Sequence, residues 1–273
     1  MQDVNGGDRS VCGRYASIKD PGALAVEFDA VDATGTYSSE AGYPAADYNV
    51  APMKSVFGVV QRHPRDADGN RDMDRTERTI RVMRWGLVPK WAKDPAIGNR
   101  MINARAETVT SKPAFRGPIK HSRCLLPADG WYEWQRGTTP KQPYFMTPGD
   151  GSSLALAGIW TTWWDPRAEG DAQPLVSCAV LTTEAVGPLA EVHERMPMVV
   201  PDSAWRHWLD PDLQDVSALL GPPPGELLGR IELRPVSRAV NNVRNNGAGL
   251  VERVAGDEPV PWEREPGEPS AEV

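Results

Sequence analysis

Residues 175–183, LVSCAVLTT, form a short apolar run of the kind that makes a buried β-strand. Four similar runs lie on either side of it: SLALAGIW at 153–160, RVMRWGLVP at 81–89, SVFGVV at 55–60 and PMVV at 197–200. Several are flanked by glycine or proline, and each is shorter than the ten residues expected of a helix. We therefore expect strands at these five positions.

Helical signals are fewer than strand signals. Pro21 and Gly22 precede ALAVEF, DSAWRHWL begins at a potential N-cap, Asp202, and DLQDVSALLG (212–221) ends in glycine. No repeat of 20 to 50 residues is visible, which argues against a solenoid or a propeller. The pattern predicts an α+β fold with a mostly antiparallel, barrel-like β-sheet and peripheral helices.

The chain divides into one compact domain and two segments outside it. We expect residues 12–250 to form the catalytic domain, because 40% apolar residues in a chain of 273 are ample for a buried core. Residues 1–11 are an N-terminal extension, and residues 251–273 are rich in Pro, Glu and Gly, which predicts a disordered acidic tail. The charged stretch 62–78 lies between two predicted strands and is expected to be an extended hairpin loop.

Composition limits the location and the partners of the protein. No apolar run is long enough to span a membrane and no secretory signal is visible, so a cytoplasmic location is expected. The net charge is −7, but residues 251–273 carry −5 of it, which leaves the rest nearly neutral and allows a local basic groove. The three cysteines are widely spaced and lack metal-ligand partners, which predicts reduced thiols and no metal site.

Three reactive residues stand in clusters with glycine, proline or aromatic residues, and each has a second interpretation. Cys12, in CGRY (12–15), is a possible nucleophile or a small buried hydrophobe. Glu133, in GWYEW (130–134), is either a general acid whose pKa is raised by aromatic walls or a strand residue facing water. His193, in HERMP (193–197), is a proton carrier or the partner of a buried hydrogen bond.

Two further clusters carry polar groups. In NARAET (103–108), Asn103 and Arg105 share one face if the segment is extended, which suits an amide beside a phosphate-pairing guanidinium. A solvated surface arginine is the commoner explanation of such a residue alone. VNNVRNNG (240–247) is a turn-rich loop by composition.

Nine motifs together are more specific than any one of them. They are, in chain order, CGRY, YNVAP (48–52), RWGLVP (84–89), NARAET, GWYEW, AGIW (157–160), LTTEA (181–185), VHERMP (192–197) and VNNVRN (240–245). This order over about 230 residues resembles the SOS response-associated peptidase (SRAP) family, the abasic-site processing proteins.

The resemblance implies a covalent mechanism on Cys12. In the family a cysteine becomes the first residue after removal of the initiator Met. Its α-amine condenses with the aldehyde of a ring-opened abasic sugar in single-stranded DNA, and its thiol closes a thiazolidine. By the same resemblance Glu133 moves protons, His193 assists opening of the sugar, and Asn103 orients the amine.

The resemblance also implies a DNA surface and few other partners. Arg105 and Arg195 are expected to hold phosphates, with Arg14 and Arg116 as further candidates and Thr182 of LTTEA beside them. Trp85 is expected to stack on a base or wedge the strand, with a core position as the alternative. No cofactor, metal or membrane is implied. A monomer is expected, and replication-fork proteins remain possible partners.

The sequence departs from the family pattern at its start, because ten residues and Val11 precede Cys12. Either Val11 marks the true initiation codon, which we favour because the Arg-rich composition suggests a GC-rich gene, or the protein cleaves itself before Cys12. Two other functional classes compete. One is a thiol peptidase acting on other proteins, with Cys12 as nucleophile and His193 as base, and the other is a noncovalent single-stranded DNA binding module.

Overall fold

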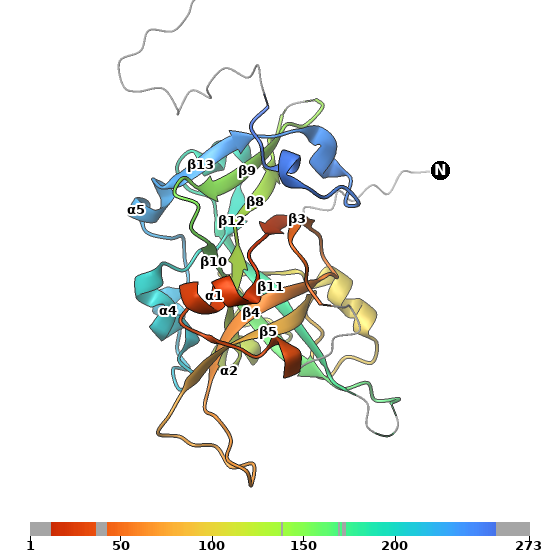
Figure 1. The fold of residues 1–273 in the computed structure, drawn as a ribbon, viewed down its shortest axis with the longest axis vertical. Helices are drawn as coiled ribbons and strands as arrows, with labels where there is room; N and C mark the ends of the chain where they lie inside the picture. Colours follow the sequence, from red (N-terminus) through yellow and green to blue (C-terminus); the bar gives the residue numbers. More distant parts are fainter. Residues whose placement is uncertain (1–11, 37–42, 138, 169, 171–172, 255–273) are drawn as a thin grey trace, which may run out of the picture.

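The computed structural model describes residues 12–36, 43–137, 139–168, 170 and 173–254, which form two β-sheets with short helices around them (Figure 1). The larger sheet has eight strands: β2 (Val31–Asp32), β4 (Ser55–Arg62), β5 (Glu77–Trp85), β6 (Asn103–Arg105), β7 (Arg123–Ala128), β10 (Leu154–Trp163), β11 (Leu175–Glu184) and β12 (Arg195–Pro197). The smaller sheet has five: β1 (Tyr15–Ser17), β3 (Asp47–Val50), β8 (Gly130–Trp134), β9 (Pro143–Pro148) and β13 (Ile231–Pro235).

Strand pairing in the larger sheet closes into a ring. The order β11-β10-β7-β4-β5 is antiparallel throughout, and β5 then pairs with β11 in parallel, with Trp85 opposite Cys178. The pairs β6–β11 and β2–β5 are also parallel. The predicted α+β class with a mostly antiparallel sheet is therefore confirmed, and parallel pairs occur at three positions.

Four of the five predicted strands are confirmed, and the reason is the burial of both faces; the fifth, PMVV, is wrong, because β12 ends at Pro197 and only an isolated bridge at Val199 follows. Along β11, Val176, Cys178 and Val180 pack into a core that includes residues of the smaller sheet. The alternate residues Ala179 and Leu181 pack into a second core beneath the helices. Because successive side chains of a strand point to opposite faces, a continuous apolar run is what a strand covered on both sides requires.

Helices cover the second core. In α1 (Pro21–Glu27) the Asp20 carboxylate accepts the N–H of Ala23 at 3.0 Å and caps the helix. In α4 (Asp202–Leu209) Trp208 is fully buried, and Pro201 rather than Asp202 occupies the N-cap position. The remaining helices are short: α2 (Pro118–His121), α3 (Leu189–Val192), α5 (Gly225–Leu228), and the 3₁₀ turns η1 (Thr34–Thr36), η2 (Pro95–Arg100), η3 (Ser217–Leu219), η4 (Arg238–Asn241) and η5 (Ala248–Leu250).

The helix predicted over residues 212–221 is wrong. Only the three residues of η3 are helical there. Proline precedes the segment at position 211 and follows it at 222–224, and the Asp215 carboxylate accepts the Ser217 N–H at 3.0 Å, which starts a local turn. Local turn chemistry therefore outweighs the apolar spacing.

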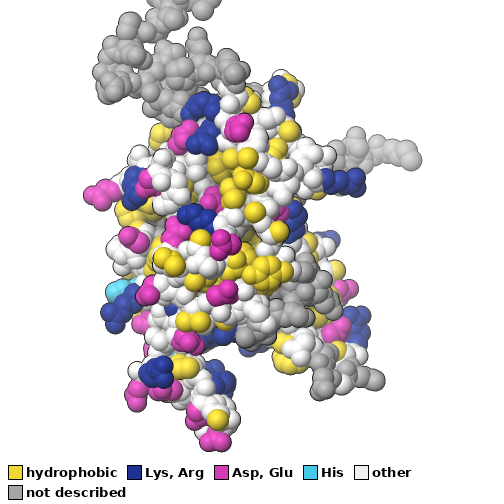
Figure 2. All heavy atoms as spheres, in the orientation of Figure 1, with side chains coloured by type: hydrophobic (Ala, Val, Ile, Leu, Met, Phe, Trp, Pro, Cys, Tyr) yellow, Lys and Arg dark blue, Asp and Glu magenta, His cyan; other side chains and the backbone are white. Residues whose placement is uncertain are grey.

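Residues 63–76, within the predicted stretch 62–78, form the loop of the β4–β5 hairpin, and residues 62, 77 and 78 belong to its strands. The loop projects from the lower end of the molecule in Figure 1, and side chains of both charges cover it in Figure 2. The predicted extension 1–11 and most of the predicted tail lie outside the described residues. Within the described part, no helix combines the length and apolarity needed to cross a membrane.

Candidate functional site

The pairing of β1 with β8 brings Cys12 to Glu133. Tyr15 lies opposite Trp131 in an antiparallel register, so the chain just before β1 runs beside the end of β8. Cys12 has a φ of 48°, and its backbone N–H donates to Glu133 Oε1 at 2.8 Å across 121 residues of sequence. Cys12 is 0% exposed and Glu133 is 3% exposed. The structure therefore joins two of the residues that the sequence analysis singled out.

Burial shifts the pKa of both groups upward. Desolvation raises the pKa of Glu133 to about 8, although the N–H of Cys12 and the charge of Arg136 act in the opposite direction. Desolvation, with a smaller contribution from Glu133, raises the pKa of the Cys12 thiol well above its usual value. At neutral pH Glu133 is therefore mostly a protonated acid, and Cys12 is a thiol rather than a thiolate.

Arg136 connects Glu133 to His193. Its backbone N–H donates to the carbonyl of Val192 at 3.3 Å, and its guanidinium lies 3.1 Å from His193 Nε2 and 2.6 Å from a carboxylate oxygen of Glu194. The same guanidinium is close enough to Glu133 to lower the pKa of that carboxyl. Sequence reasoning missed Arg136, and its position as a cation two residues after GWYEW is the signal that could have found it.

His193 is held as a neutral ring. A guanidinium only donates hydrogen bonds, so Arg136 presents a donor to Nε2 at 3.1 Å. The backbone N–H of Arg195 donates to Nδ1 at 3.0 Å, and the carbonyl of Arg195 lies 3.1 Å from the same atom. Both ring nitrogens thus face donors, which disfavours the doubly protonated ring. Desolvation, with further contributions from the charges of Arg136 and Lys141, lowers the pKa of His193. A neutral ring can accept a proton if one of these donors moves aside.

Asn103, Arg105 and Thr182 lie at one edge of the larger sheet. The parallel pairing of β6 with β11 places Asn103 beside Val180 and Arg105 beside Thr182. Asn103 is partly buried, Thr182 is 1% exposed and Arg105 is exposed. The side chain of Arg105 therefore reaches solvent at this edge, whereas Thr182 does not present its side chain to solvent.

Arg195 makes several contacts within the protein. Its Nη1 and Nη2 lie 2.8 and 3.0 Å from the two carboxylate oxygens of Glu107, and Nη2 also donates to the carbonyl of Thr182 at 2.8 Å. The Arg195 side chain is 10% exposed. A phosphate would have to replace Glu107 to use this guanidinium. Glu107, within the motif NARAET, is therefore a residue whose role the sequence analysis did not assign.

Arg14 connects the first strand to the loop VNNVRNNG. Its Nη1 donates to Asn49 Oδ1 at 2.8 Å and to the carbonyl of Val240 at 2.9 Å. Asn49, from the motif YNVAP, is fully buried, and its amide donates to the carbonyls of Val240, Asn242 and Asn245. These contacts give Arg14 and Asn49 a role in positioning the loop, which explains the two motifs structurally.

The two remaining predicted DNA contacts, Trp85 and Arg116, differ in burial. Trp85 is 0% exposed, packs on Tyr15 with ring centroids 5.2 Å apart, and donates its indole N–H to the carbonyl of Ile102 at 2.9 Å. The core alternative therefore holds for Trp85, and its predicted contact with a base does not fit this position. Arg116 is exposed and lines a cavity near α2.

The other cysteines are not part of the site. Cys124 and Cys178 are free, fully buried thiols in the core, and burial raises the pKa of each. The described residues contain no group of three or more His, Cys, Asp or Glu side chains suited to a metal ion. The candidate site therefore consists of Cys12, Glu133, Arg136 and His193.

Comparison with known proteins places the chain in a family. The model of the family described as SOS response associated peptidase (SRAP) matches residues 11–243. The chain belongs to this family. The abasic site processing protein YoqW of Bacillus subtilis (strain 168) is 34% identical to it over 250 residues, which cover 89% of this chain and 99% of that protein. The abasic site processing protein HMCES of Rattus norvegicus is 33% identical over 233 residues, covering 73% of this chain and 62% of that protein.

Solved structures share the fold of this SRAP chain. A protein from Bacteroides thetaiotaomicron superposes with a TM-score of 0.70 at 22% identity, covering 89% of this chain and all of the other. A protein from Bordetella bronchiseptica gives a TM-score of 0.61 at 24% identity and covers 83% of this chain. At these identities the likeness establishes the fold alone.

Proposed function

We propose that the protein captures ring-opened abasic sites in single-stranded DNA as a covalent thiazolidine on Cys12. The observation that carries this proposal is the buried hydrogen bond of 2.8 Å between the nitrogen of Cys12 and Glu133 Oε1. It places a carboxyl with a pKa of about 8 at the atom that would attack an aldehyde. The names of the relatives, abasic site processing proteins, support DNA aldehydes as the substrate.

The proposed reaction forms two bonds to one carbon and releases one water. The α-amine of Cys12 adds to the aldehyde carbon, and loss of the hydroxyl as water leaves an imine. The thiol then adds across the C=N bond: sulfur binds the carbon, and the thiol proton is transferred to nitrogen. The product is a five-membered ring with no change in oxidation state. It resists hydrolysis better than an imine, because both N and S hold the same carbon.

Glu133 suits the proton transfers of this sequence. Its protonated form donates to the departing hydroxyl group, and the resulting carboxylate takes the proton from nitrogen, which leaves the neutral imine and restores the acid. His193 lies on the other side of Arg136 and, as a neutral ring, is suited to accept a proton when the sugar opens. Asn103 is proposed to orient the amine, and Arg105, with Thr182 beside it, lies at the edge where the strand would pass.

The chemistry requires a free α-amine on Cys12. An amide nitrogen delocalises its lone pair into the carbonyl and cannot attack an aldehyde. In the 273-residue chain the nitrogen of Cys12 is joined to Val11 and Cys12 has no exposed surface. The active form is therefore proposed to begin at Cys12, either through initiation at Val11 and removal of the first residue or through self-cleavage.

The geometry favours this reaction over peptide hydrolysis by a thiolate. A cysteine peptidase pairs its thiolate with a histidine, which lowers the pKa of the thiol. Here burial raises the pKa of the Cys12 thiol, and the recorded ring-nitrogen contacts of His193 go to Arg136 and Arg195. The recorded hydrogen-bond partner of Cys12 among the described residues is a carboxyl group.

One gel tests the proposed function. A chain that begins at Cys12 is incubated with single-stranded DNA carrying one abasic site, then heated in detergent before electrophoresis. We expect a shifted band with abasic DNA and none with the same strand carrying an intact base. A complex that dissociates on heating would show noncovalent binding only and would overturn the covalent mechanism.

A further inference from the structure

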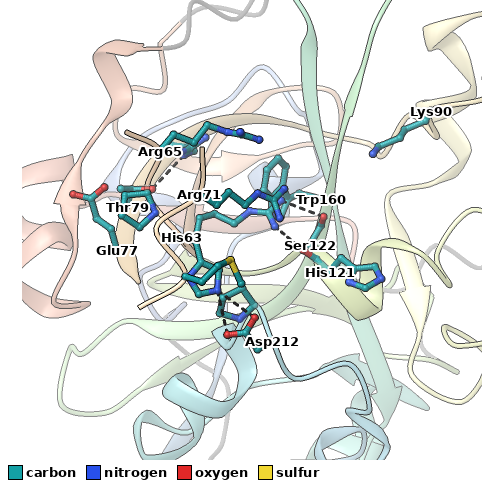
Figure 3. A pocket seen from close by; sticks show the side chains of 15 residues that line it. His63, Arg65, Arg71, Glu77, Thr79, Lys90, His121, Ser122, Trp160 and Asp212 are labelled. Atoms are coloured by element: carbon teal, nitrogen blue, oxygen red, sulfur yellow. Dashed lines mark hydrogen bonds and ion pairs between the residues drawn. The ribbon is translucent and has the colours of Figure 1, made fainter. Parts of the chain in front are cut away.

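A cavity of about 680 Å³ lies between the β4–β5 hairpin and the segment that leads into β7 (Figure 3). The ends of β4 and β5, Trp160 of β10, Ser122 and Asp212 contribute to its wall. None of the residues assigned to the reaction at Cys12 lines it. In the view of Figure 3, Lys90 reaches toward the cavity from the side opposite the hairpin, with Trp160 between them.

Positive charge exceeds negative charge in this cavity. Two carboxylates line it, Glu77 and Asp212, and Asp212 lies 3.1 Å from Nε2 of His63, which also lines the cavity. Four arginines and one lysine also line it: Arg62, Arg65, Arg71, Arg81 and Lys90. The cavity therefore suits an anion.

Some of these cations shape the wall and others are available to a ligand. The guanidinium of Arg62 lies 4.7 Å from the centre of the Trp160 ring and donates to the carbonyl of His121 at 2.8 Å, which fixes it against the wall. Arg71 and Lys90 are exposed. Among the described residues, no carboxylate is recorded at ion-pair distance from either of these two side chains.

We propose that this cavity, which we call the hairpin cavity, binds a phosphate ester. A guanidinium offers paired N–H donors that match phosphate oxygens, and an ammonium adds a mobile point charge. Arg71 and Lys90 reach the cavity from separate chain segments on opposite sides of Trp160, so each can engage its own phosphate of one strand. Ser122 and Thr79 add hydroxyl groups to the wall.

We assign the bound phosphates to the backbone of the DNA strand beyond the lesion. This choice of source rests on the proposed function. A second cavity of about 490 Å³ shares Lys90, His121 and Ser122 with the hairpin cavity and extends to Trp91 and Arg116. Trp91 is 60% exposed, and an exposed indole can stack on a base. The two cavities thus form a continuous basic surface along which a strand can lie.

Binding of single-stranded DNA to the full chain tests this assignment. A labelled 20-nucleotide strand and a labelled 5-nucleotide strand, both without a lesion, are titrated by fluorescence anisotropy at several salt concentrations. The variant Arg71→Gln/Lys90→Gln is compared with Arg206→Gln/Arg230→Gln, which removes two exposed charges outside the cavity. Unchanged thermal unfolding of both variants establishes that they are folded.

We expect the cavity variant to bind the 20-nucleotide strand about tenfold more weakly at low salt. The slope of log K against log salt should fall by about 1.4, because each phosphate contact of a single strand contributes about 0.7. The control variant and the 5-nucleotide strand should show changes below about twofold. Equal affinities of both variants and wild type for the long strand would overturn the DNA assignment.

A second titration separates the two sources of phosphate. If the long strand is unaffected but dAMP binds wild type and not the cavity variant, the cavity holds a free nucleotide and the DNA source is wrong. If the cavity variant matches wild type with both probes, the phosphate site itself is wrong. Adduct formation by a chain beginning at Cys12 with an abasic 5-nucleotide strand is measured separately, so failure of the proposed function leaves this comparison interpretable.

Discussion

The surroundings of Cys12 and the hairpin cavity treat charge in opposite ways. Around Cys12, burial keeps Glu133 protonated and the thiol neutral, so a carboxyl that would be ionised in water is held uncharged. In the hairpin cavity, Arg71 and Lys90 keep their charges in contact with solvent. The difference suggests a division of labour in which a dry region performs proton transfer and a wet basic region holds phosphate.

Replacing the nucleophile should have the largest effect. In a chain beginning at residue 12, Cys12→Ala should abolish the heat-stable adduct with abasic DNA, because the carbon–sulfur bond that closes the ring cannot form and an imine on the amine alone hydrolyses. Weak, salt-sensitive binding should remain, since phosphate contacts survive. Gel electrophoresis and anisotropy measure the two properties.

Cys124→Ala and Cys178→Ala are the matched controls, because both thiols are buried in the core, whereas the hydrogen bond to Glu133 comes from Cys12. Both should form the adduct as wild type does. Loss of the adduct in either control, with its retention in Cys12→Ala, would move the nucleophile away from Cys12.

Glu133→Gln should slow adduct formation by about 10²-fold, the usual contribution of one general acid or base. The pKa of about 8 means that the carboxyl is protonated below that pH and loses its proton above it. Since the acid form donates the proton, the wild-type rate should fall as pH rises through about 8. Single-turnover rates between pH 6 and 10 should show this decline in wild type and not in Glu133→Gln.

The variant Trp85→Ala tests whether the Trp85 side chain packs in the core or contacts DNA. Trp85→Ala should lower the free energy of unfolding by about 3–5 kcal/mol, because a fully buried indole leaves a large cavity. Trp91→Ala, at a 60% exposed position, should change it by less than about 0.5 kcal/mol. Urea unfolding gives both values. A Trp85→Ala protein with normal stability and weakened DNA binding would contradict the core role and show that Trp85 contacts DNA.

Arg136 combines a feature of each region, since its guanidinium is exposed to solvent and also contacts His193. Its charge lowers the pKa of Glu133 and that of His193. Arg136→Gln should therefore shift the alkaline decline of the rate to higher pH and reduce the rate at neutral pH only a fewfold. Arg167→Gln, which removes an exposed arginine paired with Asp165, is the control and should leave the profile unchanged.

Four of the strands could be predicted from the sequence because continuous apolar runs are what strands buried on both faces require. The helix expected over residues 212–221 failed because its apolar spacing resembles a helix while the flanking prolines and the Asp215 turn prevent one. Trp85 was ambiguous for a different reason, since residue type alone does not distinguish a core indole from a stacking one.

Within the site, motif order identified Cys12, Glu133 and His193, but not the groups that control their protonation. The contact between Cys12 and Glu133 spans 121 residues and depends on the register of β1 and β8. Arg136 reaches His193 across 57 residues through a loop that no periodicity describes. Such contacts are products of tertiary structure, and a single sequence does not reveal them.

Intact mass spectrometry of the adduct is the most direct test of the thiazolidine on Cys12. A chain beginning at Cys12 and a chain forced to retain Met1 are each incubated with a short abasic strand and measured after heating. We expect the first to gain the mass of the DNA strand minus one water, and the second to remain unmodified unless it first sheds residues 1–11. A chain that keeps Met1 and forms the same heat-resistant adduct would contradict the mechanism, because the amide nitrogen of its Cys12 cannot close the ring.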